Sequence, residues 1–395
     1  MHGMIVIGVY VLVCLYALTQ VDFHLKNIFR IKFFRFFFDL VFLALELVPL
    51  LGVLLPDTMI ETAQRNLLLH YGNIWLGFFV YFTGIMFILQ IVRIITIPFR
   101  DHEDPKARNP LGAFLLLLIC IFISLSVNIY GKANAQHLWF TQYQVNIDKI
   151  VSNHGEMKIA LVADLHIGAN SKPSLMQKMV NTINEQEADV ILIAGDIFNA
   201  AYSEIEDPQE YIDILKQFKS KNGVYIVYGN HDVESKMLGG FNITDYAEQR
   251  RSPEMDKFIK KCGFNVLDDK MIIVNGVQIA GRLDGMVTGT DATRRATASE
   301  LLGSCDVTMP IIVLEHEPLD FDALRKNGAD LVLSGHTHGG QIFPGNLISK
   351  AFYANTYGFK TVKGCKSLVT SGVGYYGPPI RLGTHSEVVV LDVSY

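Results

Sequence analysis

The sequence lacks a cysteine framework, an excess of basic charge, internal repeats and low-complexity tracts. Its five cysteines are scattered, without CxxC or disulfide-framework spacing, so they do not decide the redox compartment. The net charge is −5, and residues 134–395 hold 24 Lys and Arg against 31 Asp and Glu, a net charge of 24 − 31 = −7. Nucleic-acid-binding domains usually carry the opposite sign, so we expect no nucleic-acid partner.

Apolar residues are abundant, at 50% of the chain with a mean hydropathy of +0.27, which is high for a soluble protein. Most of the apolar stretches before residue 131 approach the ~20 residues that a helix needs to cross a bilayer. These stretches are Met4–Thr19, Phe33–Leu54, Ile74–Ile97 and Leu111–Tyr130. We therefore predict a bundle of about four transmembrane helices over residues 1–131.

The first stretch is the shortest, and a cleaved signal peptide is the alternative interpretation for it. Its start, Met1-His2-Gly3, lacks Lys and Arg, and no small-x-small cleavage site follows cleanly. A transmembrane helix is the interpretation that we prefer.

Basic residues gather in two of the three loops between these stretches. The first-to-second and third-to-fourth loops hold Lys26, Arg30, Lys32, Arg35, Arg100, Lys106 and Arg108. The second-to-third loop offers only Arg65, against Asp57 and Glu61. The positive-inside rule assigns the two basic loops to the cytoplasm, which puts residues 132–395 on the extracytoplasmic side.

Two carboxylates, Asp39 and Glu46, lie seven residues apart on one face of the second stretch. Intramembrane carboxylates are candidates for function, and these two are the observation in favour of a transporter or channel. In the structural alternative, Asp39 lies near the interface, and Glu46 is protonated or pairs with a polar group such as Gln90.

From about Ile150, short apolar runs alternate with amphipathic ones, which predicts strands and helices in an α/β domain. The predicted strands are Lys158–Ala163, Val190–Ala194, Val224–Tyr228, Ile311–Leu314, Leu331–Leu333, Ser367–Thr370 and Glu387–Val393, and the predicted helices are Lys172–Gln186, Pro208–Ser220 and Asp320–Asn327. The pair Asn275-Gly276 predicts a hairpin turn, because it supplies the positive φ angles that a two-residue turn needs. We predict mixed sheets over residues 155–395 and a juxtamembrane connector over residues 132–154.

Metal-ligand residue types follow these predicted strands. The blocks are Asp164-Leu165-His166, Gly195-Asp196, Gly229-Asn230-His231-Asp232, His316 and Gly335-His336-Thr337-His338-Gly339. α/β folds assemble their sites at the carboxyl ends of strands. One histidine alone is more often structural, but five of the six from His166 onward lie in these blocks beside Asp and Asn. The clustering predicts a metal site.

The order of the five blocks resembles the calcineurin-like metallophosphoesterase superfamily over roughly residues 155–395. The run from Gly335 to Gln341 and the tail from Ser371 to Arg381 resemble its bacterial branch with membrane helices. The resemblance implies a four-layer αββα sandwich with two metals at its edge. It implies one metal on Asp164, His166, Asp196 and His338, and another on Asp196, Asn230, His316 and His336, with Asp196 as the bridge.

The resemblance also implies that His231 lies outside the ligand set, where it protonates the leaving alkoxide or binds the phosphate. Many relatives have an Asp three residues after the bridging Asp to orient this histidine, and here that position is Asn199. An amide oxygen stabilises an imidazolium less than a carboxylate does. Asp232 is the substitute partner, with support of the fold as the alternative role.

Hard oxygen and imidazole ligands without thiolate suit Mn²⁺ first, with Fe and Zn²⁺ as alternatives, and suit Mg²⁺ or Ca²⁺ less well. Arg282, Arg294, Arg295 and Arg381 are candidates for gripping phosphate oxygens, and Tyr375-Tyr376 adds aromatic surface. Residues 234–253 are a candidate lid or lipid-facing lip, with an irregular solvent loop as the alternative.

Taken together, these features predict a metal-dependent hydrolase that cleaves a phosphoester or pyrophosphate bond by attack of a hydroxide shared between two metals. The predicted anchor in a bacterial cell membrane makes a lipid or cell-envelope substrate the natural one, although a phosphorylated small molecule also fits. The alternative is a non-catalytic membrane scaffold or sensor on the same fold. The presence of every expected ligand argues against this alternative, because buried charged groups are costly and a non-catalytic protein would have no use for them.

Overall fold

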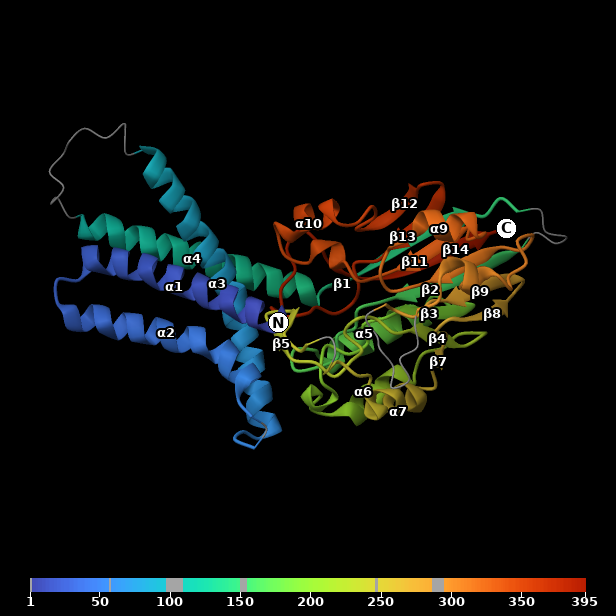
Figure 1. Cartoon of the computed structure of the whole chain (residues 1–395), viewed down its shortest axis with the longest axis horizontal. Helices are drawn as coiled ribbons and strands as arrows, with labels where there is room; N and C mark the ends of the chain where they lie inside the picture. The colour runs from blue at the N-terminus through green and yellow to red at the C-terminus, as the bar shows by residue number, and fades with distance from the viewer. Residues whose placement is uncertain (1, 57, 97–108, 150–154, 246–247, 286–294) are drawn as a thin grey trace. The chain divides into compact units, whose positions relative to one another are not determined.

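The computed structural model describes residues 2–56, 58–96, 109–149, 155–245, 248–285 and 295–395 (Figure 1). They form two compact units. Unit 1 comprises residues 1–132 with residues 237–245 and 377–379, and unit 2 comprises the rest of the chain. Asp57 and the predicted basic residues Arg100, Lys106 and Arg108 lie outside the described residues.

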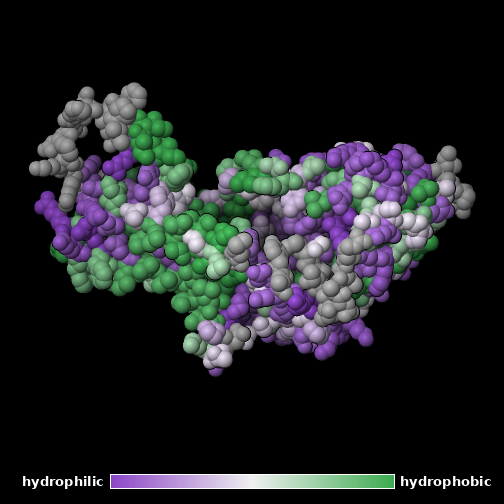
Figure 2. Space-filling model, in the orientation of Figure 1, coloured by the Kyte–Doolittle hydropathy of each residue, from purple (hydrophilic) through white to green (hydrophobic). Residues whose placement is uncertain are grey.

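Four long apolar helices start the chain: α1 (His2–Ile28), α2 (Lys32–Leu54), α3 (Thr62–Thr96) and α4 (Pro110–Gln136). Each is long and apolar enough to cross a membrane, which confirms the prediction of four such helices. Figure 2 shows hydrophobic residues covering much of their visible surface. Exposed apolar side chains of this kind are expected where lipid replaces water as the solvent.

The interior of unit 1 contains both aromatic packing and a buried carboxylate. Trp75 packs edge-on against Phe42, with ring centroids 5.5 Å apart. Glu46 is only 2% exposed, and its carboxylate oxygens have no hydrogen-bond partner among the described residues. Gln90, the partner suggested by the sequence, instead accepts a hydrogen bond from the Tyr16 hydroxyl at 2.7 Å.

The segment predicted as a lid or lip contains a small hairpin of β5 (Met237–Leu238) and β6 (Phe241–Asn242), joined by Gly239 and Gly240 at φ 62° and 96°. This hairpin belongs to unit 1. Residues 246 and 247 of the segment lie outside the described residues. The lid or lip role of the segment stays a prediction.

Unit 2 is built on two six-stranded sheets. The order of the first is β1 (Leu138–Asn146), β14 (Ser386–Ser394), β2 (Glu156–Val162), β3 (Val190–Ala194), β4 (Val224–Val227) and β7 (Asn265–Val266). The order of the second is β12 (Gly358–Val362), β13 (Cys365–Val369), β11 (Leu331–Ser334), β10 (Ile311–Leu314), β9 (Val277–Gly281) and β8 (Lys270–Val274). Strands β2, β3 and β4 are parallel, and so are β9, β10, β11 and β13.

Successive side chains along a strand point to opposite faces of the sheet, and the cores that they join show the order of the layers. On β2, Ile159 and Leu161 belong to the core between the sheets, whereas Ala160 and Val162 belong to the core under the helices α5 (Pro173–Asn184), α6 (Pro208–Leu215) and α7 (Pro253–Cys262). The outer face of the second sheet packs under α8 (Ala298–Leu302) and α9 (Phe321–Lys326). The layers are therefore α, β, β and α, and the predicted sandwich is confirmed.

Two local predictions need correction. Residues 138–146 of the predicted connector are β1, an edge strand parallel to β14 along its whole length. Strand β1 was not predicted because its side chains are only partly buried and form no clear apolar run. The helix from Pro208 ends at Leu215, five residues earlier than Ser220. The hairpin at Asn275 and Gly276 is confirmed, with φ of 49° and 80° between β8 and β9.

Candidate metal centre

The candidate ligands follow parallel strands of both sheets. Asp164, Asp196, His316 and His336 each come two residues after β2, β3, β10 and β11, and Asn230 comes three residues after β4. Because the carboxyl ends of parallel strands meet at one edge of a sheet, these side chains converge. The structure brings all seven predicted ligands together.

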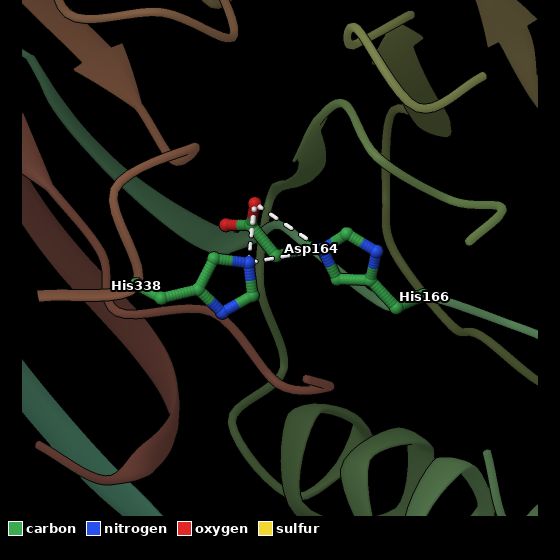
Figure 3. Close-up of side chains that lie close together, drawn as sticks. All are labelled: Asp164, His166 and His338. Atoms are coloured by element: carbon green, nitrogen blue, oxygen red, sulfur yellow. Dashed lines mark hydrogen bonds and ion pairs between the residues drawn. The ribbon is translucent and has the colours of Figure 1, made fainter. Parts of the chain in front are cut away.

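The first group is Asp164, His166 and His338 (Figure 3), and it could hold a metal ion. Nε2 of His338 lies 3.3 Å from Oδ1 of Asp164, and Nε2 of His166 lies 4.0 Å from the same oxygen. The two Nε2 atoms are 2.9 Å apart. One ligand atom from each of the three residues lies within 4.8 Å of the others, which is close enough for the three to share one ion.

The second group is Asp196, His316 and His336, with Asn230 beside it. Oδ1 of Asn230 lies 3.1 Å from Nε2 of His316 and 2.9 Å from Nδ1 of His336. Nδ1 of His316 donates to the carbonyl of Ala194 at 2.7 Å. This bond fixes the tautomer and leaves the lone pair of Nε2 turned into the group.

Asp196 connects the two groups. Its Oδ2 lies 3.1 Å from Nε2 of His316 and 3.7 Å from Nε2 of His166. Its Oδ1 accepts a hydrogen bond from the backbone N–H of His231 at 2.8 Å. Asp196 therefore lies within reach of both groups.

The backbone of the centre is strained. Five candidate ligands have positive φ angles: Asp164 at 56°, His166 at 46°, Asp196 at 53°, His336 at 70° and His338 at 50°. Residues other than glycine rarely adopt this region, and such strain persists at functional sites because the surrounding structure enforces it.

Glycine is required beside the ligands because the loops approach closely. A Cβ on Gly229 would lie 2.3 Å from Oδ1 of Asp196, and one on Gly195, whose φ is 80°, would lie 2.7 Å from Nδ1 of His316. A side chain at either position would push a ligand out of place.

Burial favours the neutral imidazoles that metals bind. It lowers the pKa of His336 to about 3 and takes the pKa of His166 and His338 well below the usual value. Burial opposes ionisation of Asp196, but His316 and His231 hold its pKa well below the usual range. Although burial opposes protonation of His316, the charge of Asp196 raises its pKa well above the usual value, and burial raises the pKa of Asp164. Nitrogen and oxygen donors that face one another in a buried site fit divalent cations such as Mn²⁺, Fe²⁺ or Zn²⁺.

His231 has a different partner from the one expected. Its Nδ1 donates to the backbone carbonyl of Asn199 at 2.8 Å, not to the Asn199 side chain. The main chain can orient the ring whatever side chain occupies position 199. The His231 ring lies 4.9 Å from the His166 ring, centroid to centroid.

Asp232 supports the fold, which was one of its two predicted roles. Its carboxylate accepts from the backbone N–H groups of Asp196 at 3.0 Å, Phe198 at 2.9 Å and Gly229 at 2.7 Å. Burial, followed by the charge of Asp196, raises the pKa of Asp232 to about 8, whereas the N–H donors favour the carboxylate. Asp232 thus holds the β3 and β4 loops together.

Arg381 does not line an open surface, in contrast to its predicted role in gripping phosphate. The side chain is fully buried. Its guanidinium donates to the carbonyls of Ser371 at 2.8 Å and His385 at 2.9 Å, and Nη2 lies 3.1 Å from Nδ1 of His338. The contacts make Arg381 a support for the loop behind His338.

Arg282 and Arg295 are likewise engaged by acidic side chains. They donate to Oε2 of the buried Glu315 at 3.1 and 2.8 Å, and Arg282 also reaches Asp320 at 3.1 Å. Glu315 directly precedes His316, so this cluster braces a ligand strand. Arg294 lies outside the described residues.

Two tyrosines complete the surroundings. Nε2 of His336 lies 2.7 Å from the hydroxyl of Tyr353, a residue for which no sequence motif gave a signal. The ring of Tyr376, noted in the sequence only as aromatic surface, lies 4.9 Å from that of His338 and 5.8 Å from that of His166. Tyr353 therefore fixes a ligand, and Tyr376 forms a wall.

Comparison with known proteins finds a family model that matches this region. The model of the calcineurin-like phosphoesterase family matches residues 157–340. A zebrafish protein named transmembrane protein with metallophosphoesterase domain is 27% identical over 306 residues, which cover 73% of this chain and 64% of the relative.

Two bacterial relatives carry the name uncharacterized metallophosphoesterase. The one from Campylobacter jejuni is 25% identical over 393 residues and 97% of both chains. The one from Helicobacter pylori J99 is 29% identical over 241 residues, 60% of this chain and 59% of the relative. The match therefore spans less than two thirds of the zebrafish and Helicobacter proteins but nearly all of the Campylobacter protein.

Proposed function

We propose that this chain, whose residues 157–340 are a calcineurin-like phosphoesterase domain, is a metal-dependent hydrolase of phosphoester or pyrophosphate bonds. The observation that carries the proposal is the convergence of two metal-ligand groups on Asp196. In the proposed assignment, Asp164, His166 and His338 hold one divalent ion, and Asn230, His316 and His336 hold the other. Asp196 contacts both.

Two ions in such a site supply a water of lowered pKa as nucleophile and polarise the phosphoryl oxygens. The chain's own contribution is position and proton transfer. Because Nδ1 of His231 donates to the Asn199 carbonyl, the Nε2 atom is left for the substrate. In the protonated state, His231 donates a proton from Nε2 to the leaving oxygen. Tyr376 excludes water from the side of His166 and His338.

The substrate that we propose is a lipid or a cell-envelope phosphate. Four helices are long and apolar enough to cross a membrane, and two short segments of unit 1 follow metal-centre residues in the sequence. Residues 237–245 follow Asp232 by a few positions, and residues 377–379 follow Tyr376 directly. A phosphate carried by a lipid or by the cell envelope suits a hydrolase domain that shares its chain with such helices.

The proposed location of unit 2 is the extracytoplasmic side of a bacterial cell membrane. Lys26 lies in the last turn of α1 and Arg93 in the last turn of α3, and the Arg93 guanidinium lies 4.2 Å from the centre of the Phe23 ring on α1. The ends of α1 and α3 therefore carry basic charge together, as expected for the cytoplasmic side. Protease added outside intact cells should cleave unit 2, and protection of unit 2 would reverse the proposed orientation.

The proposed activity is tested with the full chain in detergent, an aryl phosphate ester and added Mn²⁺. We expect metal-dependent turnover that Asp196→Ala abolishes and that Asp213→Ala retains, because Asp213 is an exposed carboxylate on α6 outside the centre. Metal binding without turnover on a panel of soluble and lipid phosphoesters would favour the alternative, a non-catalytic scaffold or sensor.

A further inference from the structure

An exposed apolar cluster lies directly beyond the metal-ligand histidines in unit 2. The segment contains α10 (Gly345–Ile348) and the short helix η5 (Ser349–Ala351). Four of its side chains are exposed: Phe343 by 51%, Leu347 by 56%, Ile348 by 56% and Phe352 by 76%. Figure 2 shows a hydrophobic patch over α10. Contiguous exposed apolar residues are a common feature of surfaces that contact a partner or a membrane.

Both ends of this segment are attached to the metal centre. It begins five residues after His338, and the N–H of Phe343 donates to the carbonyl of Leu382 at 3.0 Å. It ends beside Tyr353, whose hydroxyl lies 2.7 Å from Nε2 of His336. The segment that carries the exposed side chains is therefore held at both ends by residues next to the centre.

The same loop that anchors this segment also holds the end of the last apolar helix. The side-chain amide of Asn134, on α4, donates to the carbonyls of Arg381 at 3.0 Å and Thr384 at 2.8 Å. Leu382, between these two, pairs with Gln341 and Phe343. Asn134 is four residues beyond Tyr130, where the predicted apolar stretch ends, which is about 6 Å of helix rise.

We propose that Phe343, Leu347, Ile348 and Phe352, the apolar lip, insert into the interface of the bilayer that contains the helices. The occupant is lipid, because a helix that enters the membrane ends on the loop from which the lip starts. Lys350, exposed between Ile348 and Phe352, suits the anionic head groups at that depth. The lip also points to a lipid-linked phosphate as the substrate of the centre. This part of the inference rests on the proposed function.

The test is quenching of tryptophan fluorescence by lipids with brominated acyl chains, with the full chain in proteoliposomes. Trp75→Phe and Trp139→Phe remove the native tryptophans, and Phe352→Trp places a probe on the lip. The matched control is Phe359→Trp on β12, an exposed aromatic position outside the lip. We expect quenching at position 352 to exceed that at position 359 at least about twofold, since interfacial apolar groups lie about 5–10 Å into the head-group boundary.

Equal quenching at positions 352 and 359 would refute the proposed insertion of the apolar lip into the bilayer. Hydrolysis of a soluble aryl phosphate by the same proteoliposomes reports separately on the proposed function. Strong quenching at position 352 without hydrolysis refutes the activity and keeps the membrane contact. Hydrolysis with equal quenching keeps the activity and refutes the lip.

Discussion

Tyr353 shows how a single side chain outside the ligand set can define the centre. Its hydroxyl lies 2.7 Å from Nε2 of His336, while Nδ1 of the same ring faces Asn230 at 2.9 Å. A partner of this kind fixes which ring nitrogen is available to a metal. No motif connects Tyr353 to His336 in the sequence, because the two meet only through the fold of residues 337–352.

Tyr353→Phe should weaken metal binding by about tenfold, at the lower end of what loss of such a partner costs. Activity at saturating Mn²⁺ should fall less than activity at limiting Mn²⁺. A titration of activity against Mn²⁺ concentration measures both. Tyr225→Phe, on β4, is the control, and an unchanged Mn²⁺ midpoint for Tyr353→Phe would refute the positioning role.

Arg381 is a second residue whose role follows from burial. Arg381→Met removes donors from several buried carbonyls, and leaving buried polar groups unpaired costs about 1–3 kcal/mol each. We expect a loss of unfolding free energy of about 3 kcal/mol in denaturant titration. Unchanged stability with a raised KM would instead indicate contact with the substrate phosphate.

At the scale of elements, β14 joins the metal-centre loops to the edge strand β1. Glu387 on β14 accepts from the hydroxyl of Thr370 and the N–H of Ser371, both at 2.9 Å, and from Thr141 on β1 at 2.9 Å. Although burial opposes ionisation of Glu387, hydrogen bonds from His385, Ser371, Thr370 and Thr141 lower its pKa. The carboxylate thus ties β1 to the loop before Gly372.

The depressed pKa of Glu387 sets a pH dependence of stability. Its contribution is present above the unfolded-state pKa of 4.5 and is lost as pH falls through the lower folded-state value. Unfolding free energy should therefore decline below about pH 4.5, by at most about 1.4 kcal/mol per pH unit for this group. Glu387→Gln should lose stability at pH 7 and show a flatter acid limb, and an identical limb in the two proteins would contradict this account.

Some strands and helices could be predicted from the sequence and others could not, for physical reasons. Strands β3 and β10 match their predicted bounds because each continuous apolar run lies between an acidic residue and a Gly or Pro. Helix α7, which starts at the end of the segment predicted as a lid, lip or loop, was not predicted, although Ser252 as cap, Pro253 in the first turn and Gly263 just after the end are readable helix signals. Strand β1 was missed because edge strands are half-exposed and lack a clear apolar run.

Across the whole molecule, the convergence of the candidate ligands was predictable and the side chains around them were not. The sequence shows which Asp, Asn and His residues follow each predicted strand, and α/β folds bring the ends of parallel strands together. The partners of Arg282, Arg381 and His231 depend on which loops face one another, and the sequence does not encode that in any local pattern. An arginine near a phosphate site therefore looked like a substrate ligand until its burial was known.

The central claim is that two metal ions share Asp196. Anomalous diffraction from crystals of the full chain grown with Mn²⁺ tests it most directly. We expect two anomalous peaks about 3.5–4 Å apart, a spacing typical of two-metal sites. One peak should lie beside Asp164, His166 and His338, and the other beside Asn230, His316 and His336. A single peak, or peaks away from Asp196, would contradict it.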